Sequence, residues 1–263
     1  MTKAEMYEFD LNGYIVYRNI LAREEVDRMN VIIDSRPIGE IPYPHYQCAF
    51  EFMELDPCFL ELMARPRTLR IIRHLLNNWL RLDHTYGIQL TRTAEMVENL
   101  GGGPRSDHGQ HEYQWSSSYP PGDAPPDAPA EGRMYNGMVV VMYALDDLNP
   151  GDGGFICVPG SHKANLYYRP SITSHLVVNP PLKAGDMLIY TEALAYGIRR
   201  WQPDRRYRAL IYKYSPGHAG WESFDTIKHY RELATTDLQR AILRPPNVRA
   251  RVGLPFPEAE GNG

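Results

Sequence analysis

Two histidines and two carboxylates lie in one short stretch, and these side chains suit acid–base or metal chemistry. The stretch reads Asp107-His108-Gly109-Gln110-His111-Glu112. Imidazole and carboxylate groups bind transition metals, and imidazole also exchanges protons near neutral pH. The spacing of His108 and His111 is not specific to a metal site outside a helix, so a solvated polar loop is the simpler interpretation. His108, His111 and Glu112 stay candidate acid–base groups or, if a metal binds, candidate ligands.

Other familiar catalytic patterns are missing from the sequence. There is no Ser/His/Asp order, no P-loop and no GxGxxG fingerprint, and Gly101-Gly102-Gly103 lacks the strand–turn–helix context of a phosphate loop. Cysteine is sparse: Cys48, Cys58 and Cys157 are an odd number without CxxC spacing. Such cysteines are typical of reduced structural thiols, so we expect a cytoplasmic protein.

Length and charge restrict the class of protein further. The chain has 263 residues, of which 28 are basic and 32 acidic, so its formal net charge is −4. A nucleic-acid or anionic-membrane surface would be basic, so we expect neither partner. No apolar run reaches the roughly 18 residues of a membrane span, and the N-terminus lacks a signal-peptide layout. We expect one domain over 1–263: helical support over 1–82, a jelly-roll core over 83–218 with a loop insertion over 95–133, and a C-terminal helix and tail over 219–263.

The elements that must position these residues change character along the chain. Apolar residues at helical spacing predict helices over Glu24–Asp34 and Pro66–Leu82, and a third helical segment is expected near Phe224–Leu243. Short strand-like runs separated by Gly/Pro/Asn/Asp turns lie between them, at Thr85–Thr93, Tyr135–Leu145, Phe155–Val158, Leu176–Val178, Met187–Thr191 and Arg206–Tyr214. We therefore predict an α+β, mainly β fold built on an antiparallel jelly roll. The proline-rich stretch Pro120–Pro129 reads as a surface insertion, either a lid or a disordered segment.

Four stretches carry a family resemblance. They are Phe9–Val16 (FDLNGYIV), Gly151–Lys163 (GDGGFICVPGSHK), Leu182–Leu194 (LKAGDMLIYTEAL) and Arg208–His218 (RALIYKYSPGH). Together they resemble the phytanoyl-CoA dioxygenase family of Fe(II)/2-oxoglutarate oxygenases, in family order from Phe9 to about Pro246. The resemblance implies a cupin-like double-stranded β-helix in which two histidines and a carboxylate hold iron. It also implies an arginine that anchors the cosubstrate.

Three positions depart from the pattern that this resemblance implies. Leu100 stands where the first histidine is expected, Tyr196 stands for the second histidine, and Tyr207 stands for the arginine. Leucine offers no lone pair, a phenol is a poor ligand for Fe(II), and the cosubstrate carboxylate loses its charge-assisted anchor. Arg206 and Arg208 flank Tyr207, but strand alternation points them to the opposite face unless a one-residue bulge intervenes.

We therefore expect no metal and no 2-oxoglutarate. The leading hypothesis is an enzyme of secondary metabolism that cyclises, isomerises or eliminates a hydrophobic small molecule without a metal. The predicted catalytic residues are Tyr196, Tyr207, His108 and His111, and the predicted substrate contacts are Gln89, Thr91, Leu100, Asn136, Tyr190 and Arg208. One alternative is an active Fe(II)/2-oxoglutarate dioxygenase with displaced ligands. Another is a non-catalytic pseudo-oxygenase that binds a ligand or an active paralogue. The predicted assembly is a homodimer or a heterodimer with that paralogue.

Overall fold

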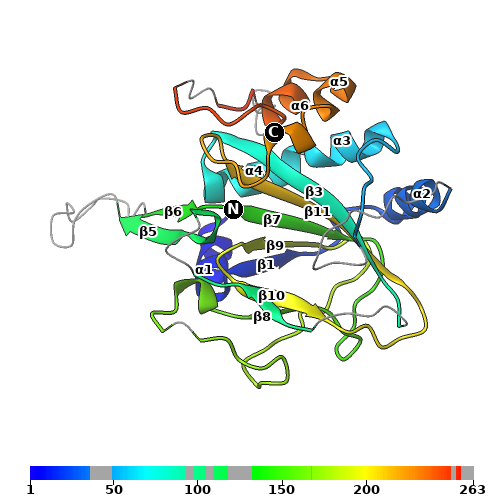
Figure 1. The fold of residues 1–263 in the computed structure, drawn as a ribbon, viewed down its shortest axis with the longest axis vertical. Coiled ribbons are helices and arrows are strands. Elements are labelled where there is room, and N and C mark those ends of the chain that lie inside the picture. The colour runs from blue at the N-terminus through cyan, green and yellow to red at the C-terminus, as the bar shows by residue number, and fades with distance from the viewer. Residues whose placement is uncertain are drawn as a thin grey trace.

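Two antiparallel sheets lie face to face in the computed structural model (Figure 1). The structure describes residues 1–35, 49–92, 98–104, 109–117, 132–166, 168–249 and 253–255, without the side chains of 115–117, 132 and 133. The six-stranded sheet has the order β1 (Tyr14–Tyr17), β9 (Met187–Thr191), β7 (Val139–Ala144), β11 (Tyr207–Pro216), β3 (Leu80–Leu90) and β2 (Ala49–Phe50). The three-stranded sheet has the order β4 (Leu100–Gly102), β10 (Ala195–Arg199) and β8 (Gly154–Val158), and β5 (Tyr113–Ser117) pairs with β6 (Gly132–Asn136). The predicted jelly-roll fold is confirmed.

The central strands β7, β9 and β11 of the larger sheet are buried on both faces, and β7 and β9 carry apolar residues at nearly every position. Along β11, Ala209 and Ile211 belong to the core between the two sheets. Leu210, Tyr212 and Tyr214 belong to a second core between the larger sheet and the helices. This division follows from the two-residue period of a strand, which directs successive side chains to opposite faces.

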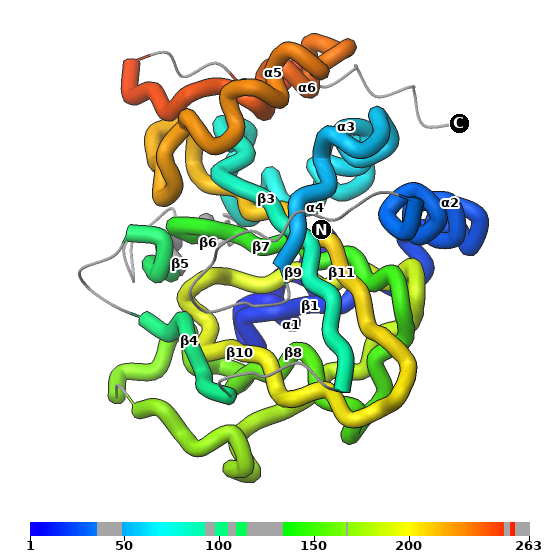
Figure 2. Tube along the Cα trace, turned by 45° about the vertical axis from the view of Figure 1, so that its right-hand side comes forward, coloured from blue at the N-terminus to red at the C-terminus, as the bar shows by residue number. Residues whose placement is uncertain are grey.

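Helices cover the outer face of the larger sheet, and Figure 2 shows α3 to α6 on the side away from β8 and β10. The helices are α1 (Lys3–Asn12), α2 (Arg23–Asp34), α3 (Pro57–Met63), α4 (Pro66–Leu76), α5 (Tyr230–Leu233) and α6 (Asp237–Ile242). Pro66 occupies the first turn of α4, where its missing N–H leaves no bond unmade. None of the helices in the described ranges is long and apolar enough to cross a membrane.

Several predicted elements differ from the observed ones. The helix predicted over Pro66–Leu82 ends at Leu76, because Asn77 takes a positive φ of 61° and β3 already begins at Leu80. The C-terminal helix is divided into a 3₁₀ turn (Phe224–Thr226), α5 and α6. Leu176–Val178 makes only a bridge from Val178 to Cys157.

The loop predicted over 95–133 also needs correction, because it contains β4, β5 and the start of β6. The unpredicted strands β1, β4 and β10 are short, and each depends on a partner distant in sequence. Pro120–Pro129 and Cys48 lie outside the described residues.

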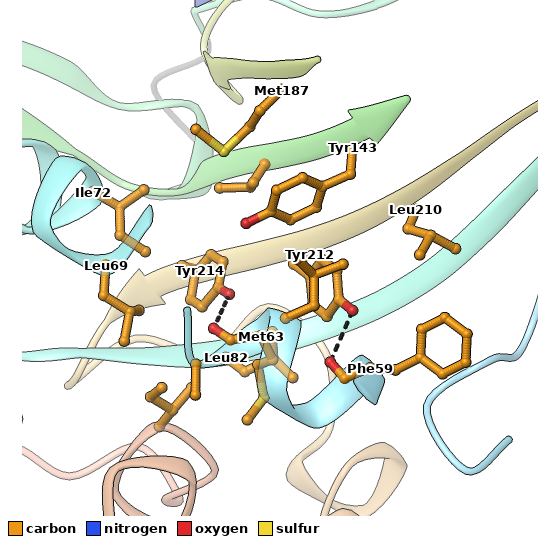
Figure 3. Close-up of a cluster of buried hydrophobic side chains, with 14 of the residues drawn as sticks. Phe59, Met63, Leu69, Ile72, Leu82, Tyr143, Met187, Leu210, Tyr212 and Tyr214 are labelled. Carbon is orange, nitrogen blue, oxygen red and sulfur yellow. Dashed lines mark hydrogen bonds between the residues drawn. The ribbon is translucent and has the colours of Figure 1, made fainter. Parts of the chain in front are cut away.

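Two buried tyrosines connect the larger sheet to α3. The Tyr214 hydroxyl donates to the Met63 carbonyl at 2.7 Å, and the Tyr212 hydroxyl donates to the Phe59 carbonyl at 2.9 Å (Figure 3). Burial raises the pKa of both phenols well above the ordinary value, so both keep the proton that they donate. These bonds fix α3 over the sheet.

We expect Tyr214→Phe to lower the free energy of unfolding by about 1–2 kcal/mol, because it leaves the Met63 carbonyl without this donor in a dry core. Urea unfolding followed by circular dichroism measures the change. Tyr7→Phe is the control, since Tyr7 is 65% exposed and its substitution removes no buried bond. Equal stability of the two variants would show that the Tyr214 bond contributes nothing.

Candidate functional site

The interior between the two sheets is lined by aromatic and aliphatic side chains. Tyr196 of β10 packs on Tyr190 of β9, with ring centroids 4.8 Å apart, and lies parallel to Phe155 of β8 at 6.1 Å. The space that remains among these rings and their aliphatic neighbours is about 20 Å³. A cavity of that size holds about one water molecule. In this conformation side chains therefore fill the interior.

A buried polar group adjoins Tyr196. The Tyr196 hydroxyl donates to Oε1 of Glu192 at 2.6 Å, and Nζ of Lys213 lies 3.2 Å from Oε2 of the same carboxylate. Glu192 and Lys213 are each 7% exposed. A buried charge requires a partner of opposite sign, and Glu192 and Lys213 are each other's partner. We call these three side chains the Tyr196–Glu192–Lys213 cluster.

Strand geometry explains why these residues meet. Glu192 follows the last residue of β9, and Tyr196 is the second residue of β10. Lys213 continues the inward-facing series of Ala209 and Ile211 along β11. Its ammonium lies 5.8 Å from the centroid of the Tyr86 ring on the neighbouring strand β3, where the negative ring face favours a cation.

The charge state of Glu192 follows from its neighbours. Burial alone would raise the pKa of this carboxyl. The charge of Lys213, the hydrogen bond from Tyr196 and the nearby His111 outweigh that effect, and the pKa is lowered below its ordinary value. Glu192 is therefore ionised at neutral pH, and with Lys213 it forms a pair without net charge.

His111 lies against the backbone of Glu192. It ends the 3₁₀ turn Gly109–His111, and its Nδ1 lies 3.0 Å from the backbone carbonyl oxygen of Glu192. Because a carbonyl only accepts, Nδ1 carries the proton of this bond. The next residue, Glu112, is partly buried, and its carbonyl accepts from the Gly137 amide at 2.9 Å. His108 lies outside the described residues.

The register of β4 directs Leu100 away from Tyr196. Gly101 lies opposite Tyr196, and Leu100 lies opposite Gly197. Directly opposed residues share a face of the sheet, so Gly101 faces the interior with Tyr196 and Leu100 faces the other way. Leu100, predicted as a substrate contact, therefore does not share a face of the sheet with Tyr196.

Tyr207 faces the interior, but Arg208 does not. Tyr207 packs on Trp201 with ring centroids 5.3 Å apart, and its hydroxyl has no hydrogen-bond partner among the described atoms. Pairing between β11 and β3 shifts only between Lys213 and Tyr214, so no bulge turns Arg208 inward. Arg208 instead donates to Asn30 and Asp34 of α2, each at 2.8 Å.

The other predicted substrate contacts are divided between several environments. Gln89 accepts from Nε of Arg208 at 3.1 Å, so it lies on the helix side of the sheet and not at the interior. Thr91 is exposed beyond the end of β3. Tyr190 lines the interior. Asn136 is buried and donates to the Leu75 carbonyl at 2.9 Å, next to α4.

Sequence reasoning misses Glu192, Lys213 and a histidine on the neighbouring strand. His84 lies opposite Lys213 in the register of β3 and β11. The Nδ1 of His84 lies 2.7 Å from Oδ1 of Asp83. Lys213 carries a signal in the sequence, because it interrupts the apolar run Ala209–Tyr214. A charge inside a buried strand needs a buried partner, and that requirement would have pointed to an acidic residue nearby.

Iron coordination does not fit the described residues. They contain no group of three His, Cys, Asp or Glu side chains placed to hold a metal ion. The carboxylate nearest to Tyr196 already carries the Lys213 ammonium, and that positive charge would repel a second cation. Arg208, which could have anchored a cosubstrate carboxylate, is engaged on the opposite face.

We expect Lys213→Met to lower the free energy of unfolding at pH 7 by about 3–5 kcal/mol, because it leaves a buried carboxylate without its counter-charge. Adding Glu192→Gln removes that charge, so the double variant should be more stable than the single one. Lys228→Met is the control, since the Lys228–Asp225 pair is exposed and worth about 0–1 kcal/mol. A destabilisation equal to that of the control would contradict the buried pair.

The pH dependence of stability provides a second measurement on Glu192. Its folded pKa is lowered from an ordinary value of 4.5, so its contribution is fully present above that value and is lost as the pH falls through the folded pKa. We expect Glu192→Gln to flatten the decline of unfolding free energy in this acidic window. A variant that retains the full decline would show that Glu192 does not titrate this way.

Solved structures of other proteins have folds similar to that of this chain. HygX from Streptomyces hygroscopicus, with nickel and 2-oxoglutarate bound, has a TM-score of 0.66 at 23% identity over 82% of this chain and 87% of that chain. The iron-bound structure of HygX has a TM-score of 0.62 at 24% identity, again over 82% of this chain and 87% of that chain. SnoN, a non-heme alpha ketoglutarate dependent epimerase from nogalamycin biosynthesis, gives 0.56 at 16% identity over 82% and 83%. At these identities the likeness concerns the fold. No curated protein sequence matches the chain.

The family comparison covers most of the elements that form the site. Residues 9–197 match the Phytanoyl-CoA dioxygenase (PhyH) family. The match extends from the end of α1 into β10 and includes Glu192 and Tyr196. It spans more than half of the 263 residues. The chain therefore belongs to the phytanoyl-CoA dioxygenase family.

Proposed function

We propose that this protein is a tailoring enzyme of secondary metabolism that works without iron or 2-oxoglutarate and catalyses a cyclisation, isomerisation or elimination. One observation carries the proposal. At the position that the family resemblance assigns to an iron-binding histidine, Tyr196 donates to a carboxylate that is paired with a buried lysine. This arrangement suits proton transfer better than metal binding.

The cluster provides a path for a proton. The Tyr196 hydroxyl donates its proton to Glu192, and a phenol oxygen also accepts hydrogen bonds, so a substrate N–H or O–H can donate to it. A proton leaving one substrate atom passes to this oxygen while the phenol proton moves to Glu192. The reverse transfer returns a proton to another substrate atom. In a cyclisation or isomerisation the substrate keeps all its atoms, and in an elimination the returned proton departs with the leaving group. No oxidant is consumed in any of the three.

The surroundings support a hydrophobic substrate. Tyr86, Phe155 and Tyr190 contribute aromatic surface near Tyr196, and aliphatic residues complete the lining. Ligand sites are commonly apolar with a few polar groups that fix orientation. HygX has been solved with hygromycin B bound, and SnoN is described as an epimerase, so this fold accepts natural products and carries an isomerising reaction.

Two other functions have support of their own. The iron- and 2-oxoglutarate-bound neighbours support an oxygenase whose ligands are displaced to His108, His111 and Glu112. The small interior space favours a non-catalytic protein, since about 20 Å³ is far below the roughly 300–1,000 Å³ of ordinary ligand pockets. For the enzyme that we propose, interior side chains must move before a substrate enters.

Anaerobic titration with Fe(II) and 2-oxoglutarate distinguishes the oxygenase from our proposal. We expect no metal-to-ligand charge-transfer band and no succinate formation, because the described donors do not form an iron site. HygX, solved with iron and with 2-oxoglutarate, serves as the positive control for the same titration. A clear band at stoichiometric iron would overturn the metal-independent function.

Substitution of Tyr196 distinguishes the enzyme from a binding protein. For a compound that the protein converts, we expect Tyr196→Phe to lower kcat by about 10²–10⁴-fold and to change KM less, since the ring stays and the proton path is removed. The wild-type rate should survive chelators. Tyr168→Phe is the control, because Tyr168 is exposed. Unchanged kcat in Tyr196→Phe would exclude the proton path.

A further inference from the structure

A pocket of about 340 Å³ lies outside the barrel interior. It is bounded by the end of α4, by β6 and by the segment that follows β11. It shares no lining residue with the space around Tyr196 and is far larger. Asn136, predicted from the sequence as a substrate contact, lies in this pocket and not around Tyr196, and the function proposed above does not use it.

Two rings and several apolar side chains form the walls of this pocket. Trp79 and His218 lie against each other with ring centroids 5.3 Å apart and planes inclined by 37°. Leu75, from the buried face of α4, and Val248, from the C-terminal segment, add aliphatic surface. Such walls favour a flat, largely apolar ring system.

One side chain in the pocket lacks a hydrogen bond that it is equipped to make. Asn136 is 1% exposed, and its Nδ2 donates to the Leu75 carbonyl at 2.9 Å, which fixes the orientation of the amide. Within the described part of the chain, Oδ1 accepts no hydrogen bond. A buried acceptor left unpaired is unfavourable, so a ligand that donates to Oδ1 would gain affinity.

The backbone of the pocket is strained at the end of α4. Asn77 has φ 61° and ψ 179°, a combination that glycine adopts readily and other residues rarely do. Such a conformation is unfavourable and persists only where the surroundings impose it, most often at functional sites. Asn77 itself lines the pocket, directly after the helix that supplies Leu75. The strain and the unpaired acceptor are independent observations on the same pocket.

We propose that this pocket is a second small-molecule site, which binds a planar apolar ring carrying one N–H or O–H donor. The ring packs beside Trp79 and His218, and the donor meets Oδ1 of Asn136. This site is separate from the chemistry of the Tyr196–Glu192–Lys213 cluster, so its occupation does not depend on that cluster.

Indole and benzothiophene test the proposal, because the two rings are similar in size and only indole carries an N–H donor. Saturation-transfer NMR and calorimetry measure their binding to the full chain. We expect indole to bind about tenfold more tightly, which corresponds to the roughly 1.4 kcal/mol of one recovered hydrogen bond. Equal affinities would show that Asn136 is not the acceptor, and absence of saturable indole binding would overturn the site.

Two matched variants locate the binding. Val248→Trp places a larger side chain at the pocket, and Val31→Trp makes the same change on α2, with the two valines 69% and 68% exposed. We expect indole affinity to fall at least about tenfold in Val248→Trp and to stay unchanged in Val31→Trp. Both variants should keep the wild-type melting temperature. If indole binds Val248→Trp and Val31→Trp equally, it binds elsewhere and the proposed site is wrong.

Discussion

Burial of both faces of β11 is the constraint on which the rest of the molecule depends. The strand lies between β7 and β3, and its alternating side chains supply two separate cores. Inward positions include Tyr207 and Lys213, and outward positions include Arg208 and Tyr214. No side chain of this strand is left to solvent. Its two charged groups therefore take partners from other parts of the chain: Arg208 pairs with Asp34 of α2, and Lys213 pairs with Glu192.

The same charged groups are the basis of the chemistry that we propose for the interior. A family barrel built for iron concentrates neutral and anionic donors that attract a cation. In this chain the carboxylate beside Tyr196 is neutralised by a lysine, and Arg208, which follows Tyr207, donates to α2. In the interior, the Tyr196 phenol therefore lies between the Glu192 carboxylate and a small space lined by aromatic rings. That balance is the physical basis for the proton-transfer function that we propose.

The general fold could be predicted from the sequence, but much of the site could not. Alternation and turn residues were sufficient for the jelly roll, and the same alternation separated Tyr207 from Arg208. The face of the sheet on which Leu100 lies depends on the strand register. A shift of one residue moves every side chain of a strand to the opposite face. Lys213 stands out inside an apolar run, but nothing in the sequence pairs it with Glu192, which lies 21 residues away. Their contact follows from the pairing of β9, β7 and β11.

The filled interior has a kinetic consequence. Because only about 20 Å³ is open around Tyr196, a ligand reaches the hydroxyl only after the surrounding rings have changed rotamer or the sheets have separated. The frequency of those fluctuations then sets an upper limit on association, whatever the ligand concentration. Selectivity then depends on timing as well as on shape. A molecule must arrive while the interior is open, and it must also fit the open cavity.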